Sequence, residues 1–511
     1  MNNTKKSGIC YLVGAGPGDP GLLTMRGKEC IERADVLIYD YLCNPELLRF
    51  AKPDAERIYA GKKSADHTMT QEQINQLLVE KTKEHKVVTR LKGGDPFIFG
   101  RGGEEAQALA KAKQKFEIVP GISSAIAGAA YAGIPVTHRA HNTMLTIFTG
   151  HEDPEKTEST MDFENIARTP GTKVMLMGVE RIAKITDALQ KHGADSQMPV
   201  ALIRWATTGK QETLTGTLAD IAEKVESAKF KAPAVAVFGE VVSLRKELNW
   251  FEKRPLFGKR IAVTRTRKQA GTLIEQLREL GADAFELPTI RIEPPKDVRE
   301  FAELVQDAHL YDWIVFTSPN AVDAFFEMFY KLYDDARSLG GARIAAIGPA
   351  TALRVKDQKL HVDLQPDKYI AEAVIEAFKK YESVENLKFL LPRAEETREV
   401  LGKELAKMGA IVDEIAAYRT VPETGDPTGG VARFREEGAD MITFTSSSTV
   451  KNFLDLKLEL PKNLKTASIG PITSETMRDH KLAIDCEAKQ HDIPGLVKTI
   501  LQYFTKSKSD L

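Results

Sequence analysis

The sequence has few cysteines, no dominant charge and no long apolar run. Its 511 residues include four cysteines, Cys10, Cys30, Cys43 and Cys486, without any CxxC pair. We therefore expect neither a disulfide framework nor a bound metal. Free cysteines are typical of a reducing compartment, which we expect for this protein. The 71 basic residues balance the 72 acidic ones, so the net charge is −1. No overall field would draw this chain to nucleic acid, and we expect no nucleic-acid partner.

Nothing in the sequence suits a secretion signal or a membrane span. The apolar stretch Ile9–Val13 stops at Gly14, and no run approaches 18 apolar residues. We therefore expect a soluble, cytoplasmic protein with no membrane partner. The composition, 42% hydrophobic and 28% charged, is that of a globular chain rather than a disordered one. At roughly 150 residues per domain, the length predicts three to four domains.

Strand and helix patterns alternate along the chain. The apolar run Ile9–Val13, the helical stretch Leu22–Ala34 and the apolar run Val36–Tyr39 form a strand, a helix and a strand. Similar strands continue as far as Ala234–Phe238. This alternation predicts an α/β fold. A break in the pattern at Asn249–Gly258 indicates a domain boundary.

We accordingly expect a first domain over residues 1–250, a linker over 251–258 and a second part over 259–511. The second part contains an internal duplication. Phe316-Thr317-Ser318 corresponds to Phe444-Thr445-Ser446, and Ile347-Gly348-Pro349 corresponds to Ile469-Gly470-Pro471. This repeat predicts two similar α/β domains with a ligand cleft between them. Their expected bounds are 259–291 with 422–505 for one, and 292–421 for the other.

The first glycine-rich loop, Gly14–Gly21, follows a strand but does not suit a phosphate group. A dinucleotide-binding fingerprint would need glycine at position 19, where Asp19 places a negative charge. A tight turn without any ligand is the plain alternative. If the loop does bind a ligand, its glycines suit a nucleoside that carries no phosphates.

Two further loops carry small or polar residues. Arg90–Glu105 contains five glycines, which let the backbone pass close to a ligand. Within it, Asp95 could accept hydrogen bonds from an amine or from ribose hydroxyls. Ser123 and Ser124 stand at a helix start, where capping the helix is the alternative role.

Together these loops resemble the tetrapyrrole methylase family, and within it the uroporphyrinogen-III C-methyltransferases, over roughly residues 8–250. The resemblance implies a two-lobed α/β fold that binds S-adenosylmethionine between its lobes and forms a homodimer through this half. Two positions depart from the family: Ser123-Ser124 replaces a frequent Thr-Ala pair, and Ala206 replaces a frequent glycine. The cofactor contacts that the resemblance implies are Pro17, Gly93, Gly94, Asp95, Ile98, Ser123, Ser124, Met177, Ala206 and Ala234.

The same resemblance assigns Asp40 as proton acceptor and Lys62 as proton donor. In this reaction a pyrrole carbon attacks the sulfonium methyl group, and the ring must then lose a proton, which a carboxylate can take. In a dinucleotide enzyme Asp40 would instead bind ribose hydroxyls. The substrate carries eight carboxylates, which require local cations. The candidates are Arg90, Arg101, His138 and Arg139, for each of which a solvated surface charge is the alternative.

The second half, roughly residues 257–505, resembles uroporphyrinogen-III synthase. The repeated motifs above, together with Ala417-Tyr418-Arg419-Thr420, carry this resemblance. It implies two α/β domains joined by a two-stranded connector, Leu287–Ile292 with Ile415–Val421, and no cofactor. Tyr418 is the candidate to assist loss of the substrate hydroxyl, with a half-buried strand tyrosine as the alternative. The candidate donors to the substrate carboxylates are Thr317, Ser318, Ser446, Thr473 and the backbone amides of Gly348 and Gly470.

We therefore expect a bifunctional enzyme. One half would close hydroxymethylbilane to uroporphyrinogen III. The other would methylate that product at C-2 and C-7 to give precorrin-2, towards sirohaem and cobalamin. Two alternatives stay open: a methylase that acts on a later corrin intermediate, and a second half that only senses a ligand.

Overall fold

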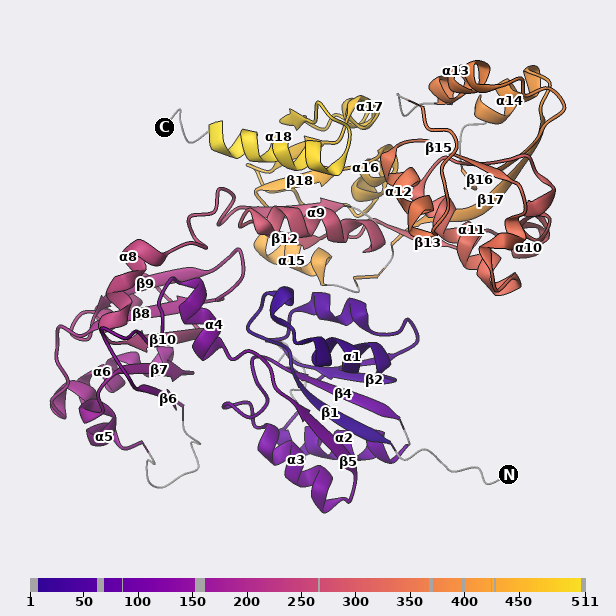
Figure 1. The fold of residues 1–511 in the computed structure, drawn as a ribbon. Helices are drawn as coiled ribbons and strands as arrows, with labels where there is room; N and C mark the ends of the chain where they lie inside the picture. The colour runs from indigo at the N-terminus through magenta and orange to yellow at the C-terminus, as the bar shows by residue number, and fades with distance from the viewer. Residues whose placement is uncertain are drawn as a thin grey trace.

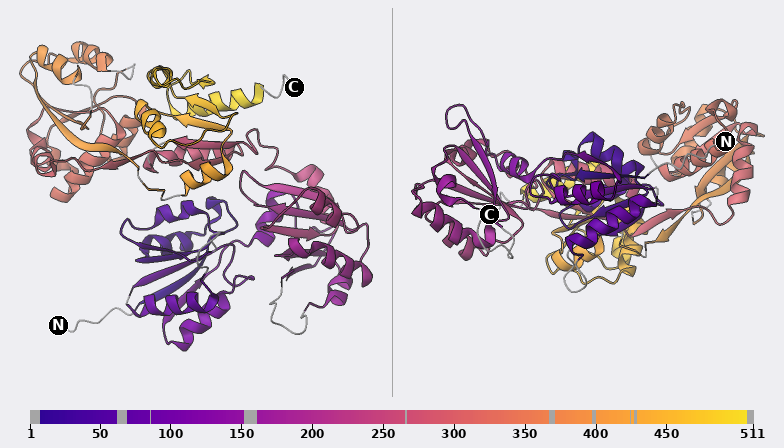
Figure 2. Two further views of the ribbon diagram at one scale, coloured as in Figure 1. Left: turned by 180° about the vertical axis from the view of Figure 1, so that it is seen from behind. Right: turned by 90° about the horizontal axis from the view of Figure 1, so that it is seen from below.

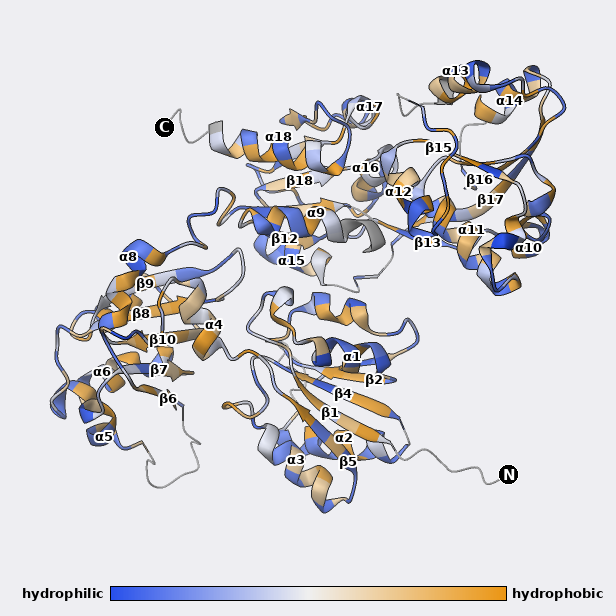
Figure 3. Ribbon diagram, viewed as in Figure 1, coloured by the Kyte–Doolittle hydropathy of each residue, from blue (hydrophilic) through white to orange (hydrophobic). Residues whose placement is uncertain are grey.

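The computed structural model describes residues 8–61, 69–84, 86–151, 161–264, 267–366, 371–396, 400–423, 425–426 and 429–506. These residues form four five-stranded sheets with helices packed against them (Figures 1 and 2). Two sheets lie in the first half of the chain and two in the second. Apolar residues concentrate in the strands and on the helix faces that cover them (Figure 3). The α/β fold class predicted from the alternating pattern is confirmed.

The first sheet is parallel, with strand order β3-β2-β4-β1-β5. Both of its faces are covered. In β1, Tyr11 and Val13 pack into one apolar cluster, whereas Cys10 and Leu12 pack into the other. The strands are β1 (Ile9–Gly14), β2 (Val36–Tyr39), β3 (Glu56–Tyr59), β4 (Val87–Lys92) and β5 (Lys115–Val119). The helices are α1 (Met25–Arg33), α2 (Gln71–Lys83) and α3 (Gly102–Lys111), with the 3-10 turns η1 (Pro20–Leu22) and η2 (Pro45–Phe50).

The second sheet is mixed, with strand order β6-β7-β10-β8-β9. Helix α4 packs against it through small residues, and Gly128 allows a close approach, because a Cβ there would lie 3.0 Å from Val235. The strands are β6 (Leu145–Thr149), β7 (Thr172–Leu176), β8 (Pro199–Arg204), β9 (Glu212–Thr217) and β10 (Ala234–Phe238). The helices are α4 (Ser124–Tyr131), α5 (Phe163–Arg168), α6 (Ile182–Lys191), α7 (Ile221–Ser227) and α8 (Arg245–Leu248), with η3 (Val179–Arg181) and η4 (Glu240–Leu244).

The third sheet has the order β12-β11-β18-β19-β20 and is parallel throughout. Its strands are β11 (Arg260–Thr264), β12 (Asp283–Glu286), β18 (Met441–Phe444), β19 (Lys465–Ser468) and β20 (Cys486–Glu487). Its helices are α9 (Arg267–Glu279), α15 (Gly430–Glu437), α16 (Ser447–Asp455), α17 (Pro471–Asp479) and α18 (Ile493–Lys506).

The fourth sheet repeats this arrangement. Its order is β13-β17-β16-β14-β15, so β17-β16-β14-β15 matches β12-β11-β18-β19, and the internal duplication is confirmed. The strands are β13 (Ile290–Glu293), β14 (Trp313–Phe316), β15 (Arg343–Ala346), β16 (Lys388–Ala394) and β17 (Ile411–Pro422). The helices are α10 (Val298–Gln306), α11 (Pro319–Leu332), α12 (Pro349–Asp357), α13 (Ala371–Tyr381) and α14 (Val400–Lys407), with η5 (Ala308–Leu310) and η6 (Ala336–Leu339).

The two repeated units are joined by two strands. β13 pairs antiparallel with the end of β17, from Ile290 opposite Pro422 to Glu293 opposite Arg419. The predicted connector is therefore present, with its first strand beginning at Ile290 rather than Leu287. In the described part of the chain, no helix is both long and apolar enough to span a membrane.

Candidate functional sites

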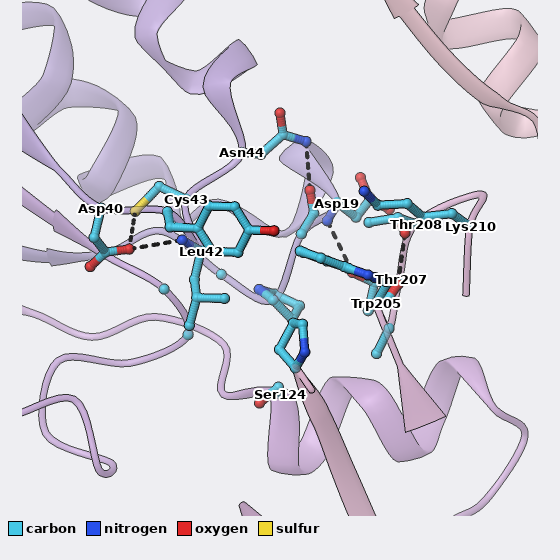
Figure 4. A pocket seen from close by; sticks show the side chains of 18 of the residues that line it. Asp19, Asp40, Leu42, Cys43, Asn44, Ser124, Trp205, Thr207, Thr208 and Lys210 are labelled. Carbon is cyan, nitrogen blue, oxygen red and sulfur yellow. Dashed lines mark hydrogen bonds between the residues drawn. The ribbon is translucent and has the colours of Figure 1, made fainter. Parts of the chain in front are cut away.

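A cavity of about 900 Å³ lies between the first two sheets. Loops that follow β1, β2 and β4 line one side, and the ends of β7 and β8 line another (Figure 4). All ten residues that the methylase resemblance implies as cofactor contacts line this cavity, and so do Asp40 and Arg101. Because the strands of the first sheet are parallel, their carboxyl ends meet at one edge, the usual place for a ligand in such a sheet.

Glycines let three of the lining loops touch through their backbones. Gly16 and Gly94 exchange two hydrogen bonds, with N···O distances of 3.2 and 2.8 Å. A Cβ on Gly14 would lie 2.4 Å from the Cα of Gly121, and a Cβ on Gly121 would lie 2.3 Å from the carbonyl oxygen of Gly94. Side chains at these positions would force the loops apart, so glycine is needed here for backbone contact.

Asp95 holds the second loop to the third. Its Oδ1 accepts hydrogen bonds from the backbone amides of Phe97 (2.8 Å) and Ile98 (3.2 Å), and its Oδ2 accepts one from Gly121 (2.9 Å). The residue is 8% exposed. Both carboxylate oxygens thus have backbone partners, and Asp95 shapes the cavity wall through the loops that it joins.

Asp19 ties the first loop to the second sheet. Its Oδ2 accepts a hydrogen bond from the Tyr131 hydroxyl of α4 (2.8 Å), and its backbone amide donates to Thr207 Oγ1 (3.0 Å; Figure 4). Its Oδ1 caps η1 through the amide of Gly21. The aspartate that breaks the dinucleotide-binding pattern therefore connects the two lobes.

Ser123 and Ser124 begin α4 at the cavity. The Ser123 hydroxyl caps the helix by accepting from the amide of Ala125, at 3.3 Å, and this residue is buried. The structure therefore gives Ser123 the capping role that was its alternative. Ser124 follows in the first turn and also lines the cavity.

Asp40 lies at the edge of the cavity, where hydrogen bonds and an ion pair with other protein groups hold its carboxylate. Its Oδ1 accepts from the amide of Leu42 (3.1 Å) and the thiol of Cys43 (3.4 Å; Figure 4). Its Oδ2 is 3.4 Å from a guanidinium nitrogen of Arg90. The side chain keeps 25% exposure, so it is accessible from the cavity.

Arg90 does not line the cavity and is buried. It pairs with Asp40 and, through Nε at 3.4 Å, with the fully buried Glu105. Lys92 also pairs with Glu105, at 2.7 Å, and does line the cavity. Burial, and then the charge of Arg90, lower the pKa of Lys92. Arg90 is thus placed to hold Asp40, and its guanidinium faces carboxylates inside the protein rather than the cavity.

The remaining predicted residues of this half are dispersed. Arg101 lines the cavity and pairs with Glu104 at 2.7 Å. His138 and Arg139 are exposed in a turn away from the cavity lining, so a role in binding the substrate there is not supported. Lys62 lies outside the described residues.

Left-handed backbone conformations cluster around the cavity. Phe99, Arg101, Met177, Trp205 and Thr207 have φ values from 45° to 69°, which cost energy for residues other than glycine. All five line the cavity. Met177 is 52% exposed as a result of this turn at the end of β7. Such strain is typical of functional sites, where the surrounding structure maintains it.

Sequence reasoning missed several residues of the cavity wall. Lys92, Trp205, Lys210 and Arg254 line it. Lys92 directly precedes the Gly93-Gly94 pair, which was the available signal. The other three come from an irregular loop and from the expected linker, where no periodic pattern marks a site.

A second set of polar groups lies in the duplicated half, at the carboxyl ends of parallel strands. Ser318 follows β14 and caps α11, accepting from the amide of Ala321 at 3.2 Å. Its hydroxyl is 3.1 Å from the Tyr418 hydroxyl on β17. Tyr418 is buried, and burial raises the pKa of its hydroxyl, against a smaller opposing effect of Ser318. Tyr418 is therefore protonated at neutral pH and can donate a hydrogen bond.

Equivalent polar groups occur at helix starts in both repeats. Ser446 follows β18 and caps α16. Gly348 precedes α12, and Gly470 precedes α17, each with proline as the first helical residue. These helix starts present backbone amides that lack a partner within the helix. Thr317 is partly exposed beside Ser318, whereas Thr473 is buried in the first turn of α17, so its hydroxyl is not presented to solvent.

Comparisons with known proteins agree with this division. The family described as "Tetrapyrrole (Corrin/Porphyrin) Methylases" matches residues 10–222, and the family "Uroporphyrinogen-III synthase HemD" matches residues 271–498. The chain is 35% identical over 501 residues to the "Porphyrin biosynthesis protein HemD" of Ruminiclostridium josui, covering 97% of this chain and 98% of that protein.

Two further proteins are similar to this chain. The "Uroporphyrinogen-III C-methyltransferase" of Bacillus subtilis is 42% identical over 362 residues, which cover 71% of this chain and 74% of that protein. The crystal structure of uroporphyrin-III C-methyl transferase from Thermus thermophilus, complexed with S-adenyl homocysteine, is 37% identical. It covers 46% of this chain and 100% of its own, with a TM-score of 0.41.

Proposed function

The chain belongs to the family of the Ruminiclostridium josui porphyrin biosynthesis protein HemD, and from this premise we propose that its two halves catalyse consecutive steps of tetrapyrrole synthesis. The second half closes hydroxymethylbilane to uroporphyrinogen III. The first half methylates that product at C-2 and C-7, which gives precorrin-2 for sirohaem and cobalamin. The proposal includes a cytoplasmic location and a homodimer formed through the methylase half.

One observation carries the methyltransferase assignment: the ten residues implied as cofactor contacts line a single cavity with Asp40 at its edge. S-adenosylmethionine fits the chemistry of this wall. It carries no phosphate, and Asp19 would repel one. When bound, the cofactor supplies a methyl group activated by a sulfonium charge. The loops joined by Asp95 and by the Gly16–Gly94 hydrogen bonds provide a preformed backbone surface on which Gly93, Gly94, Met177 and Ala206 would hold it.

Asp40 is the group that we assign to the proton transfer. Carbon–carbon bond formation at a pyrrole leaves a positive charge on the ring, which a nearby carboxylate stabilises before the proton is lost. The buried Arg90 and the amide of Leu42 fix the orientation of Asp40 and leave part of it open to the cavity. The assignment of Lys62 as proton donor stays a proposal from the resemblance.

In the synthase half, the Tyr418–Ser318 pair is the proposed site for loss of the substrate hydroxyl. A neutral tyrosine can donate to the departing oxygen, and the helix starts after β14, β15, β18 and β19 offer amides to the carboxylate arms. These groups hold the reactive bilane so that its last ring is inverted on closure. This role calls for positioning more than for a strong acid or base.

Asp40→Asn tests the methyltransferase assignment. The substitution keeps the size and hydrogen-bonding reach of the side chain but removes its charge. We expect turnover on uroporphyrinogen III to fall by about 10²-fold or more, with an unchanged dissociation constant for S-adenosylmethionine. Calorimetry and single-turnover kinetics measure the two quantities. Weakened cofactor affinity with full turnover at saturation would instead give Asp40 a role in cofactor binding.

A further inference from the structure

The cavity of the methylase half has a third wall, which comes from the synthase half. Besides the two lobes, residues of β12, of the end of α9 and of α15 line it, among them Arg278, Phe285 and Arg433. In Figure 1, α15 and β12 lie directly above the loops of the first sheet. The methyltransferase cavity is thus completed by residues that follow the methylase family match in sequence.

Residues 251–258, the expected linker, form a packed joint at this wall. Phe251 is 4% exposed and Leu256 is fully buried. Phe251 contacts the ring of Tyr131 of α4, with centroids 4.8 Å apart, and the amide of Leu256 donates to the carbonyl of Leu280. The joint is therefore anchored to both halves, and it holds them in one arrangement.

Direct contacts between the halves reinforce the joint. Glu46 of η2 forms a two-pronged ion pair with Arg278, and Lys210 Nζ is 3.4 Å from Glu437 of α15. Gly209 packs so closely that a Cβ on it would lie 2.2 Å from the backbone nitrogen of Asp283. A side chain at position 209 would therefore force the two halves apart.

Arg254 lies within the joint and also lines the cavity. Its guanidinium lies over the rings of Trp250 and Phe251, 4.8 and 5.1 Å from their centroids, and donates to the carbonyl of Arg278. Among the ion pairs of the described residues, none involves Arg254. An arginine held by ring stacking and one backbone acceptor keeps further donors for a planar anion such as a carboxylate.

Lys210 is the second cation of this wall. It lies over the Trp205 ring, 4.1 Å from the centroid, and its side chain is 23% exposed. Besides Glu437, the charged groups that act on it are Arg433 and Asp283, and Glu436 also lines the cavity. Burial, and then the charge of Arg433, lower the pKa of Lys210. A carboxylate arriving beside Lys210 would oppose that shift.

We propose that Arg254 and Lys210 bind carboxylate arms of the tetrapyrrole, so that the methyltransferase site is built partly by the joint and the synthase half. This inference rests on the proposed function and names the cations that it requires. Of the predicted candidates, Arg101 lines the cavity, whereas Arg90, His138 and Arg139 do not. Arg254 and Lys210 line the wall that the joint and the synthase half contribute. Their place between the halves puts the arms of the macrocycle against the synthase half, beyond the loops assigned to the cofactor.

The test uses the full chain with Arg254→Gln and Lys210→Gln, and Lys253→Gln as the matched control. Lys253 is the exposed neighbour of Arg254 and does not line the cavity. Methylation of supplied uroporphyrinogen III gives kcat and KM, calorimetry gives the affinity for S-adenosylmethionine, and hydroxymethylbilane turnover reports the synthase half. We expect KM to rise about tenfold in both variants, with the other three quantities and the control within twofold of wild type. In Arg254→Lys, which keeps the positive charge, the KM should return part of the way to the wild-type value.

Three results would overturn the inference: an unchanged KM in both variants, an equal rise in Lys253→Gln, or an equal loss of synthase turnover in Arg254→Gln and Arg254→Lys. The last of these would give Arg254 a structural role only. Failure of the proposed function is distinguishable, because wild-type protein would then not methylate uroporphyrinogen III at all.

Discussion

The Tyr418 hydroxyl is the side-chain group whose role can be tested with the smallest change. Tyr418→Phe removes one oxygen and the contact with Ser318 at 3.1 Å. We expect synthase turnover to fall about 10- to 100-fold, since a hydrogen-bond donor is lost but the steering surface remains. Because burial raises the pKa of Tyr418 above that of a free tyrosine, ionisation of this group should not reduce wild-type activity at neutral or mildly alkaline pH.

Rates of uroporphyrinogen III formation from hydroxymethylbilane, with isomers separated, measure this effect. Methylation of supplied uroporphyrinogen III serves as the control and should be unaffected. Unchanged synthase turnover in Tyr418→Phe would make Tyr418 a packing residue of β17, the alternative considered from the sequence.

For single residues, the sequence predicted which of them lie together better than it predicted what each side chain binds. The residues implied as cofactor contacts line one cavity, because glycine loops after parallel strands have few places to meet. The hydrogen-bond and ion-pair partners of each side chain could not be predicted from these motifs. Asp95 is an acceptor in either case, but whether backbone amides or a ligand satisfy it depends on where the third loop lies. Arg90 has the charge expected of a substrate ligand, yet β4 directs it inward to Glu105.

At the scale of elements, three loops of the methylase half meet through the backbones of their glycines. Gly121→Ala places a Cβ 2.3 Å from the oxygen of Gly94 and 2.6 Å from the Cα of Gly14, so backbone must move. We expect the affinity for S-adenosylmethionine to fall at least tenfold, in line with an overpacking cost of about 1–3 kcal/mol.

Gly103→Ala is the matched control for this prediction, since a Cβ at Gly103 meets nothing within 4 Å. Calorimetry on both variants decides the matter. An affinity in Gly121→Ala equal to that of Gly103→Ala would show that contact between the loops does not shape the cofactor site.

Elements with strong local patterns were the predictable ones. The alternation of apolar strands and helices indicated α/β sheets, and the repeated Phe-Thr-Ser motif indicated the duplication, since Ser318 and Ser446 cap equivalent helices. The strand order of the second sheet, and its mixture of parallel and antiparallel pairs, could not be predicted from local patterns. Its strands pair by tertiary contact, and no local signal distinguishes parallel from antiparallel neighbours there.

For the whole molecule, the arrangement of the halves was beyond sequence reasoning. Residues 251–258 interrupt the pattern as a linker does, yet Phe251 and Leu256 are buried in a packed joint. Such packing depends on surfaces contributed by distant segments, including Tyr131 and Leu280. The consequence is a methylase cavity with a wall from the synthase half, which neither half's own motifs reveal.

The central claim is that one chain performs both the cyclisation and the methylation. The most direct measurement incubates the full chain with hydroxymethylbilane and S-adenosylmethionine labelled in its methyl group, followed by isolation and isomer analysis of the macrocycle. Without enzyme, the bilane closes to the type I isomer. We predict a type III macrocycle carrying two labelled methyl groups. A type I skeleton, or a type III macrocycle without label, obtained from folded protein would contradict the account.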